Sequence, residues 1–205
     1  EHLAIIALQR IKGIAPAIKQ RLMEGKESIS SLFEGKATHN DEGVYKKITA
    51  FKGWNDVARD LKVIKEMGVH VLTIRDSEYP VQLRNIPDAP LVLYKKGELK
   101  IGPDTVAIVG SRRASFESIN MAEKIAQTLS SAGITVISGL ARGVDAAAHR
   151  GALKEKGKTV GVLGCGIDIC YPTENRSLFE KMGQEGCILT EYSPGEPPMQ
   201  HHFPA

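Results

Sequence analysis

The chain has few cysteines, few aromatic residues and no long apolar run. Its 205 residues include three cysteines, one tryptophan and 5% aromatic residues in all. A sparse, odd-numbered cysteine set argues against a disulfide scaffold and favours a reducing compartment. No segment reaches the roughly 20 apolar residues that a transmembrane helix needs, and the N-terminus has no signal-peptide pattern. We therefore expect a soluble, cytoplasmic protein.

Several ligand-binding motifs are also missing. The loop that begins at Gly110 has neither Gly-x-Gly-x-x-Gly nor the Gly-Lys-Ser/Thr ending of a P-loop, which argues against NAD and ATP. The absence of Gly-x-Ser-x-Gly argues against an α/β-hydrolase. Cys165 and Cys170 lack the spacing of a zinc site, and no second ligand pair accompanies them. We expect neither a cofactor nor a metal.

The overall charge gives little information about partners. A formal net charge of +3 does not by itself indicate a nucleic-acid binder. The excess of lysine and arginine lies in residues 1–66, while residues 67–205 are balanced. A basic binding site in the second part would therefore depend on where individual arginines are placed.

Residues 1–66 have the pattern of a small all-α domain. Apolar residues recur at helical spacing from Leu3 to Ile11, and the period resumes at Ile18 after a break around Gly13 and Pro16. A helix, a glycine-containing turn and a second helix resemble the helix-hairpin-helix unit, whose turn presents backbone N–H groups to phosphates. A plain helical hairpin that only packs is the alternative, and the sequence leaves both open.

The rest of the chain, residues 67–205, alternates strands and helices. Strands are predicted at residues 106–109, 134–138, 159–163 and 187–190. Helices are predicted between the cap at Ser115 and the break at Gly133, at residues 144–153 and at about residues 175–182. This alternation is typical of an α/β fold in which right-handed crossovers build a parallel sheet. We predict a Rossmann-like parallel sheet with helices on both faces.

Three glycine-containing loops follow these strands. They contain Gly110, Ser111 and Arg112, then residues 138–143, then residues 164–168. Because the carboxyl ends of parallel strands share one edge of a sheet, the three loops are expected to lie close together. Backbone N–H groups at helix N-termini and arginine side chains both bind phosphate oxygens. The sequence therefore predicts a phosphate-bearing ligand at this edge, with Ser115 placed to cap the first helix.

Other candidate residues have less specific interpretations. Tyr171 could stack on a base or merely pack at the rim of the site. Asp145 and His149 lie four residues apart on one helix face, and we favour a structural hydrogen-bonded pair because no nucleophile with a partnered base is visible. The adjacent His201 and His202 are expected in a solvated loop. None of these residues indicates an enzyme.

Taken together, these loops resemble those of the DNA-processing protein A (DprA, also called Smf) family. The resemblance covers about residues 69–205 and includes residues 108–112, Ser115, 138–145, 148–149, 151–153, 157–159, 163–168, Tyr171, Pro172, Asn175, 191–192, Phe203 and Pro204. Upstream, Tyr79, Pro80, Leu83, Pro90 and residues 93–97 also fit. Residues 1–66 resemble the sterile-alpha-motif-like domain of some members.

The resemblance implies a single-stranded DNA-binding protein of bacterial natural transformation. Such proteins protect incoming strands, help to load the RecA recombinase, act as homodimers and have no established catalytic reaction. Carried over to this chain, the expected DNA-binding residues are Gly110, Ser111, Arg112, Ser115, Ser138, Gly139, Arg142, Gly143, Gly164, Gly166, Tyr171 and Phe203. Among them Phe203 is implied as a contact to a base.

Two departures and one rival interpretation accompany the resemblance. Thr173 is neutral where many members have a basic residue, and the chain stops at Ala205 where the family continues with Arg-Asn-Arg. We therefore expect the C-terminal part of the family fold to be missing. The rival is a nucleoside monophosphate hydrolase of the lysine-decarboxylase-like Rossmann family, although its Pro-Gly-Gly-x-Gly-Thr stretch is absent. A recruiting module with a vestigial pocket is a third interpretation.

Overall fold

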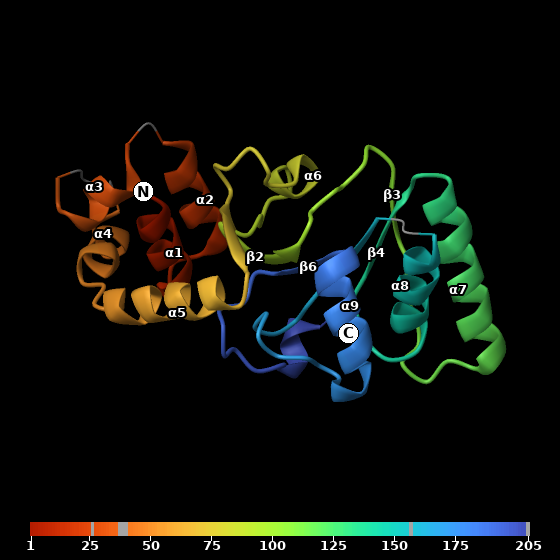
Figure 1. The fold of residues 1–205 in the computed structure, drawn as a ribbon. Coiled ribbons are helices and arrows are strands. Elements are labelled where there is room, and N and C mark those ends of the chain that lie inside the picture. The colour runs from red at the N-terminus through yellow and green to blue at the C-terminus, as the bar shows by residue number, and fades with distance from the viewer. Residues whose placement is uncertain (26, 37–40, 156–157, 204–205) are drawn as a thin grey trace. The chain divides into compact units, whose positions relative to one another are not determined.

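A computed structural model describes residues 1–25, 27–36, 41–155 and 158–203. The chain, drawn in Figure 1, divides into two compact units. The first unit contains residues 1–66 and 71–93, and the second contains residues 67–70 and the chain from Tyr94 onward. The expected boundary after residue 66 differs from this division, because residues 71–93 group with the helical part. Gly157 and Pro204, which belong to the family motifs, lie outside the described residues.

The first unit is mainly helical. Its elements are α1 (His2–Arg10), α2 (Pro16–Glu24), α3 (Ile29–Phe33), α4 (Glu42–Thr49), α5 (Trp54–Glu66), β1 (His70–Thr73) and α6 (Val81–Arg84). Pro16 stands at the first position of α2, where its missing N–H costs no hydrogen bond. Ile5, Leu8, Ile29 and Ile48 are buried between the helices. The helical hairpin of α1 and α2 is therefore present, while a nucleic-acid role for its turn stays a prediction.

Hydrogen bonds join residues 71–93 to the helices of the same unit. The Leu91 N–H donates to the Gln9 side chain at 3.3 Å, and the Gln20 side chain donates to the Ile86 carbonyl at 3.1 Å. The Arg75 guanidinium donates to the Met23 carbonyl at 3.1 Å. These contacts join residues far apart in sequence, which explains why local periodicity placed the boundary elsewhere.

The second unit is built on a mixed sheet. Its strands are β2 (Val92–Gly97), which begins in the first unit, β3 (Thr105–Ala107), β4 (Thr135–Ser138), β5 (Thr159–Val162) and β6 (Cys187–Thr190). The full strand order is β1-β2-β6-β5-β4-β3. Strands β3 to β6 pair in parallel, and β2 pairs antiparallel with β6, with Tyr94 opposite Thr190. The predicted α/β class is confirmed, with one antiparallel neighbour added to the parallel core.

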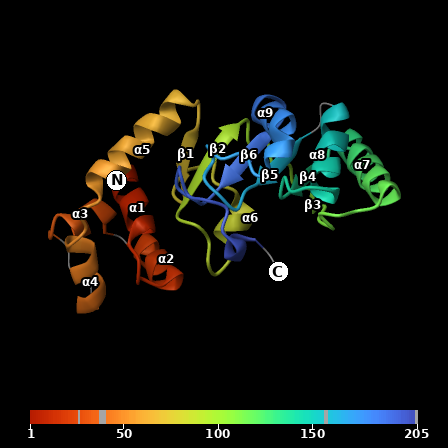
Figure 2. The ribbon, with the colours of Figure 1, turned by 90° about the horizontal axis from the view of Figure 1, so that it is seen from below.

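Three helices connect the parallel strands: α7 (Phe116–Ser131), α8 (Val144–Lys154) and α9 (Arg176–Glu185). Figure 2 shows them in a row beside the strands. Thr159 and Gly161 lie on one face of β5 because they are two residues apart. His149 of α8 hydrogen-bonds to Thr159, and Met182 of α9 lies against Gly161. Helices α8 and α9 therefore cover the same face of β5.

Small residues let α7 and α8 pack closely. Ala126 of α7 is buried against Ala148 and Ala152 of α8, together with Val136 of β4. On the other side of the sheet, Leu99 and Ile101 pack against a buried cluster of strand residues, namely Val160, Cys187 and Leu189. The parallel strands are thus fixed from both sides, which holds the loops at their carboxyl ends in place. Within the described residues, no helix combines the length and the apolar character needed to span a bilayer.

Candidate nucleic-acid interface

A pocket of about 220 Å³ lies where the parallel strands end. It is lined by Arg112, Arg113, Gly139, Ala141, Arg142, Tyr171, Pro172 and Phe203. The lining residues come from the loops after β3, β4 and β5 and from the end of the described chain, so the loops converge as expected. Three of these residues are arginines, which concentrates basic side chains in one small hollow. We call this hollow the strand-exit pocket.

Aromatic rings form part of the pocket wall. The Phe203 ring lies 5.9 Å from the Tyr171 ring, centroid to centroid, at an interplanar angle of 40°. The Arg112 guanidinium lies 5.2 Å from the centroid of the Phe203 ring, a distance typical of a cation–π contact. This contact holds the guanidinium beside the ring while its N–H groups stay available to an anion. An arginine beside aromatic rings can bind a phosphate while the rings stack on a base.

Two glycines let the loops approach one another this closely. A Cβ at Gly164 would lie 2.7 Å from Cε1 of Phe203, so any other residue would push the ring away. Gly143 has a φ of +75°, and a Cβ there would overlap the carbonyl oxygen of Ser111. Both glycines are therefore needed for contacts within the protein. Their effect on the pocket is to set its shape.

Asp145 links the loop after β4 to its neighbours. Its carboxylate, at the start of α8, accepts a hydrogen bond from the Gly139 N–H at 3.1 Å. Burial raises the pKa of the Asp145 carboxyl, and hydrogen bonds from the backbone of Ala141, Gly139 and Gly110 act in the opposite direction. The Gly139 N–H thus already has a partner inside the protein. The arginine side chains remain the groups best placed to bind a ligand anion.

Arg142 is held by an acidic neighbour. Its Nη2 atom forms an ion pair with Oε1 of Glu174, which belongs to a short 3-10 helix, η1 (Thr173–Asn175). The Asn175 side chain donates to the carbonyl of Leu140 at 2.9 Å and to that of Ala141 at 3.2 Å. These bonds fasten η1 to the loop that carries Arg142.

Comparison with known proteins identifies the family. Residues 70–205 match the family described as DNA recombination-mediator protein A. The chain belongs to the DNA recombination-mediator protein A family. It is 35% identical to Protein Smf of Synechocystis over 98% of this chain and 53% of that protein. It is 43% identical to DNA processing protein DprA of Streptococcus pneumoniae over 65% of this chain and 47% of that protein. The chain thus spans about half of each of these two relatives.

Two solved structures of DNA processing protein A have a fold similar to that of this chain. DNA processing protein A from Streptococcus pneumoniae superposes with a TM-score of 0.79 at 30% identity, over 98% of this chain and 71% of that one. DNA processing protein A from Helicobacter pylori, whose structure was reported for its single-stranded DNA binding mode, gives a TM-score of 0.57 at 31% identity. That match covers 66% of this chain and 60% of the other. The resemblance seen in the sequence motifs is therefore confirmed.

The site residues predicted from the sequence of this chain fall into two groups. Five of them line the strand-exit pocket: Arg112, Gly139, Arg142, Tyr171 and Phe203. The others have partners inside the loops. The Ser111 hydroxyl accepts from the Arg113 N–H at 3.0 Å, Ser115 caps α7 by accepting from the Ser118 N–H at 3.3 Å, and Ser138 donates to the Ile108 carbonyl at 2.7 Å.

Three glycines of the predicted set also lie in loop contacts. The Gly166 N–H donates to the Glu196 carbonyl at 2.8 Å. Gly110 packs against Val144, and Gly164 lies beneath Phe203. Together with Gly143, they shape the three loops, and their role in DNA binding stays a prediction.

Sequence reasoning missed Arg113, Ala141, Pro172 and the partner of Arg142. Arg113 directly follows Arg112, so the doubled arginine was a signal that both side chains enter the site. Glu174 follows Thr173, which the sequence comparison had marked only as neutral. A carboxylate that neutralises a site arginine cannot be recognised from spacing, because the two residues are 32 positions apart.

The Asp145–His149 pair proposed from the sequence does not form. Asp145 binds the loop backbone, whereas Nδ1 of His149 hydrogen-bonds to Oγ1 of Thr159 at 2.8 Å. The Thr159 hydroxyl in turn donates to the Val136 carbonyl at 2.9 Å. Burial lowers the pKa of His149 to about 4, so the ring is neutral. The prediction that the two side chains bond to each other is therefore wrong, and each binds another group of the protein.

The histidine doublet near the end of the described chain is also more ordered than the sequence indicates. The His202 ring stacks on the Tyr192 ring at 3.9 Å, and its Nδ1 hydrogen-bonds to the Gly164 carbonyl at 3.0 Å. This places the neighbouring Phe203 against the pocket. In the part of the chain that the structure describes, no three histidine, cysteine or acidic side chains group as metal ligands.

Proposed function

We propose that this chain binds single-stranded DNA without reading its base sequence. The strand-exit pocket supplies arginines for phosphates and aromatic rings for bases, which is the combination that sequence-independent single-strand binders use. The observation that carries the proposal is Arg112 against Phe203, with Tyr171 next to the same ring. The reported single-stranded DNA binding mode of the Helicobacter pylori relative supports it.

The size of the pocket favours part of a polymer over a free cofactor. Sites that enclose a small-molecule ligand usually measure roughly 300–1,000 Å³. The strand-exit pocket, at about 220 Å³, is smaller. It suits one phosphate with its attached nucleotide, while the rest of the strand continues over the surface. We propose binding without a catalytic step.

The family resemblance extends the proposal to the whole protein. We propose that the complete protein acts in the cytoplasm during natural transformation, as a homodimer that protects incoming strands and helps to load RecA. These activities belong to the full length of the relatives, of which this chain spans about half. RecA filament formation on pre-coated single strands, with and without the complete protein, would test them.

The binding proposal is tested by fluorescence anisotropy with labelled oligonucleotides. We expect similar affinities for oligo-dT and a mixed sequence, and weaker binding to a duplex. Replacing Arg112 by alanine removes a charged donor, and we expect affinity for every sequence to fall by about tenfold or more. Arg150→Ala is the matched control, because Arg150 is an exposed arginine on α8 that pairs with Glu123.

The control should bind like the unchanged protein, within about twofold. Equal affinity of Arg112→Ala and Arg150→Ala for oligo-dT would show that the pocket is not the binding site. Incubation with a panel of nucleoside monophosphates tests the rival hydrolase, and release of free base would contradict binding without catalysis.

A further inference from the structure

The ion pair between Arg142 and Glu174 lies at the surface of the pocket. Their side chains are 59% and 58% exposed, so both remain open to solvent. Arg142 lines the pocket, whereas Glu174 approaches it from η1, next to the lining residue Pro172. A phosphate that enters the pocket meets a guanidinium whose charge is already neutralised.

The segment that carries Glu174 is fixed to the loop that carries Arg142. The two hydrogen bonds from Asn175 fix η1 to the carbonyls of Leu140 and Ala141. Leu140 is buried and has a φ of +54°, a left-handed conformation that non-glycine residues adopt only when their surroundings demand it. The segment that carries Glu174 and the loop that carries Arg142 are therefore fixed to each other.

The other two pocket arginines differ from Arg142. Among the described residues, the ion pairs within 4.0 Å include Arg142 but neither Arg112 nor Arg113. Arg112 contacts the Phe203 ring instead. Two of the three guanidinium groups thus offer their charge to a ligand, and the third offers it only after Glu174 leaves.

We propose that Glu174 competes with DNA phosphate for Arg142 and so limits the affinity of the pocket. The proposal rests on the proposed function, because it needs the pocket to hold a phosphate. In the free protein the carboxylate occupies the guanidinium, and in the complex a phosphate oxygen takes its place. Exposed ion pairs change an equilibrium by roughly fivefold at most, so a phosphate can displace the carboxylate.

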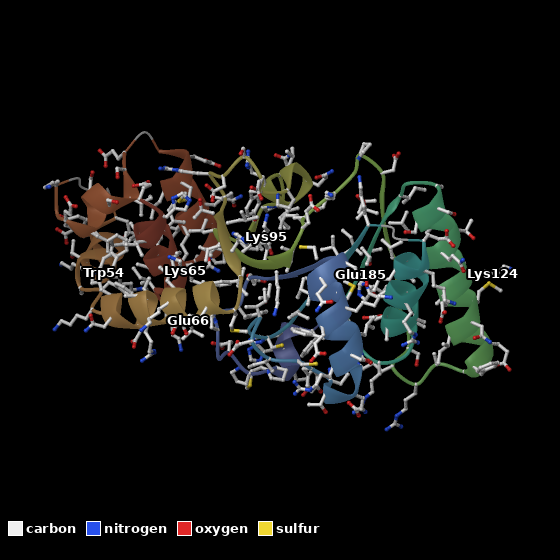
Figure 3. The ribbon with its side chains drawn as sticks, in the orientation of Figure 1. Trp54, Lys65, Glu66, Lys95, Lys124 and Glu185 are labelled. Atoms are coloured by element: carbon white, nitrogen blue, oxygen red, sulfur yellow. The ribbon has the colours of Figure 1, made fainter. Side chains whose placement is uncertain are left out.

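Glu174→Gln tests the competition directly. The amide keeps the size of the side chain and removes its charge, so we expect affinity for labelled oligo-dT to rise about two- to fivefold at low salt. Glu185→Gln is the matched control. Glu185, which Figure 3 labels, lies at the end of α9. It forms another exposed ion pair, with Lys181, and is not among the residues that line the pocket. This substitution removes the same charge, and we expect a change smaller than about 1.5-fold.

A double-mutant cycle separates competition from general repulsion. If Glu174 acts by occupying Arg142, the gain from Glu174→Gln should disappear in an Arg142→Ala background. An equal gain in both backgrounds would mean that the carboxylate repels the strand from the whole pocket, and would overturn the proposal. If Glu174→Gln gives no gain in affinity in the protein that keeps Arg142, the proposal is also overturned.

An NMR measurement without DNA distinguishes this proposal from the proposed function. The Arg142 Nε–H resonance should shift in Glu174→Gln and stay in place in Glu185→Gln. An unchanged resonance in Glu174→Gln would show that no ion pair exists and would overturn the proposal even if DNA binds. If the resonance shifts but neither the unchanged protein nor any variant binds an oligonucleotide, the proposed function is contradicted. The proposed competition is then contradicted as well, because it requires DNA binding.

Discussion

Single residues at the strand ends divide into those that face the pocket and those that hold the loops. Arg112 and Phe203 contact each other at the pocket wall, whereas Ser138 and Asp145 bind backbone groups beneath it. Arg112 and Ser138, which the sequence predicted together as DNA-binding residues, therefore act at different depths. A substitution at the pocket wall should change the affinity for DNA. A substitution of a residue that binds the loop backbone should change the free energy of unfolding.

His149 allows a prediction about pH at this scale. Its pKa falls from the ordinary 6.5 to about 4 because the ring is buried. The unfolded chain takes up a proton near pH 6.5 while the folded ring stays neutral until about pH 4. Its stabilising contribution is therefore complete above pH 6.5 and is lost as the pH falls toward 4. Between pH 8 and pH 5 we expect a loss of about 2 kcal/mol in the free energy of unfolding.

Urea unfolding of the unchanged chain and of His149→Asn checks this prediction. Asparagine keeps a group that can hydrogen-bond to Thr159 and does not titrate, so its stability should depend less on pH. Burial raises the pKa of Asp145, which gives a pH dependence of the opposite sign, but Asp145 is present in both proteins and cancels in the comparison. Parallel pH profiles for the two proteins would contradict the assignment.

At the scale of elements, the sequence predicted the alternation of strands and helices in the second unit. The strand at Cys187–Thr190 agrees with the prediction, and α8 agrees within one residue. The agreement arises because β-branched strands and apolar helix faces are local patterns. The sequence also predicted that the three loops converge, because the carboxyl ends of parallel strands lie at one edge of the sheet.

Other features depend on contacts between distant residues and were not predictable. Residues 71–93 join the helical unit through partners such as Gln9 and Gln20, which no local pattern connects to them. The ion pair of Arg142 with Glu174 and the separate partners of Asp145 and His149 have the same origin. Sequence spacing indicates which side chains share a face, but the packing of neighbouring elements decides which groups meet.

The contact between two loops gives a prediction at this scale. Gly143→Ala combines a strained φ with an overlap against Ser111, and we expect the free energy of unfolding to fall by about 2–4 kcal/mol. Gly133→Ala is the control, because Gly133 has a φ of +81° but no atom within 4 Å of the added Cβ. It should lose only about 1–2 kcal/mol. Equal losses in urea unfolding would show that the loops are not in contact.

For the whole molecule, function depends on where charge is concentrated. The formal net charge is only +3, yet three arginines meet in one pocket of the second unit. A polymer of phosphates would respond to that local concentration, and binding should release counterions from the strand. Salt dependence therefore reports on the pocket rather than on the average charge.

The slope of the binding constant against salt concentration tests the central claim most directly. For single strands, each neutralised phosphate contributes a slope of about −0.7 on logarithmic axes, so two to three contacts predict about −1.5 to −2 with oligo-dT. Arg112→Ala should make the slope shallower by about 0.7, and Arg150→Ala should leave it unchanged. A slope near zero, or one that Arg112→Ala and Arg150→Ala alter equally, would contradict phosphate binding by the strand-exit pocket.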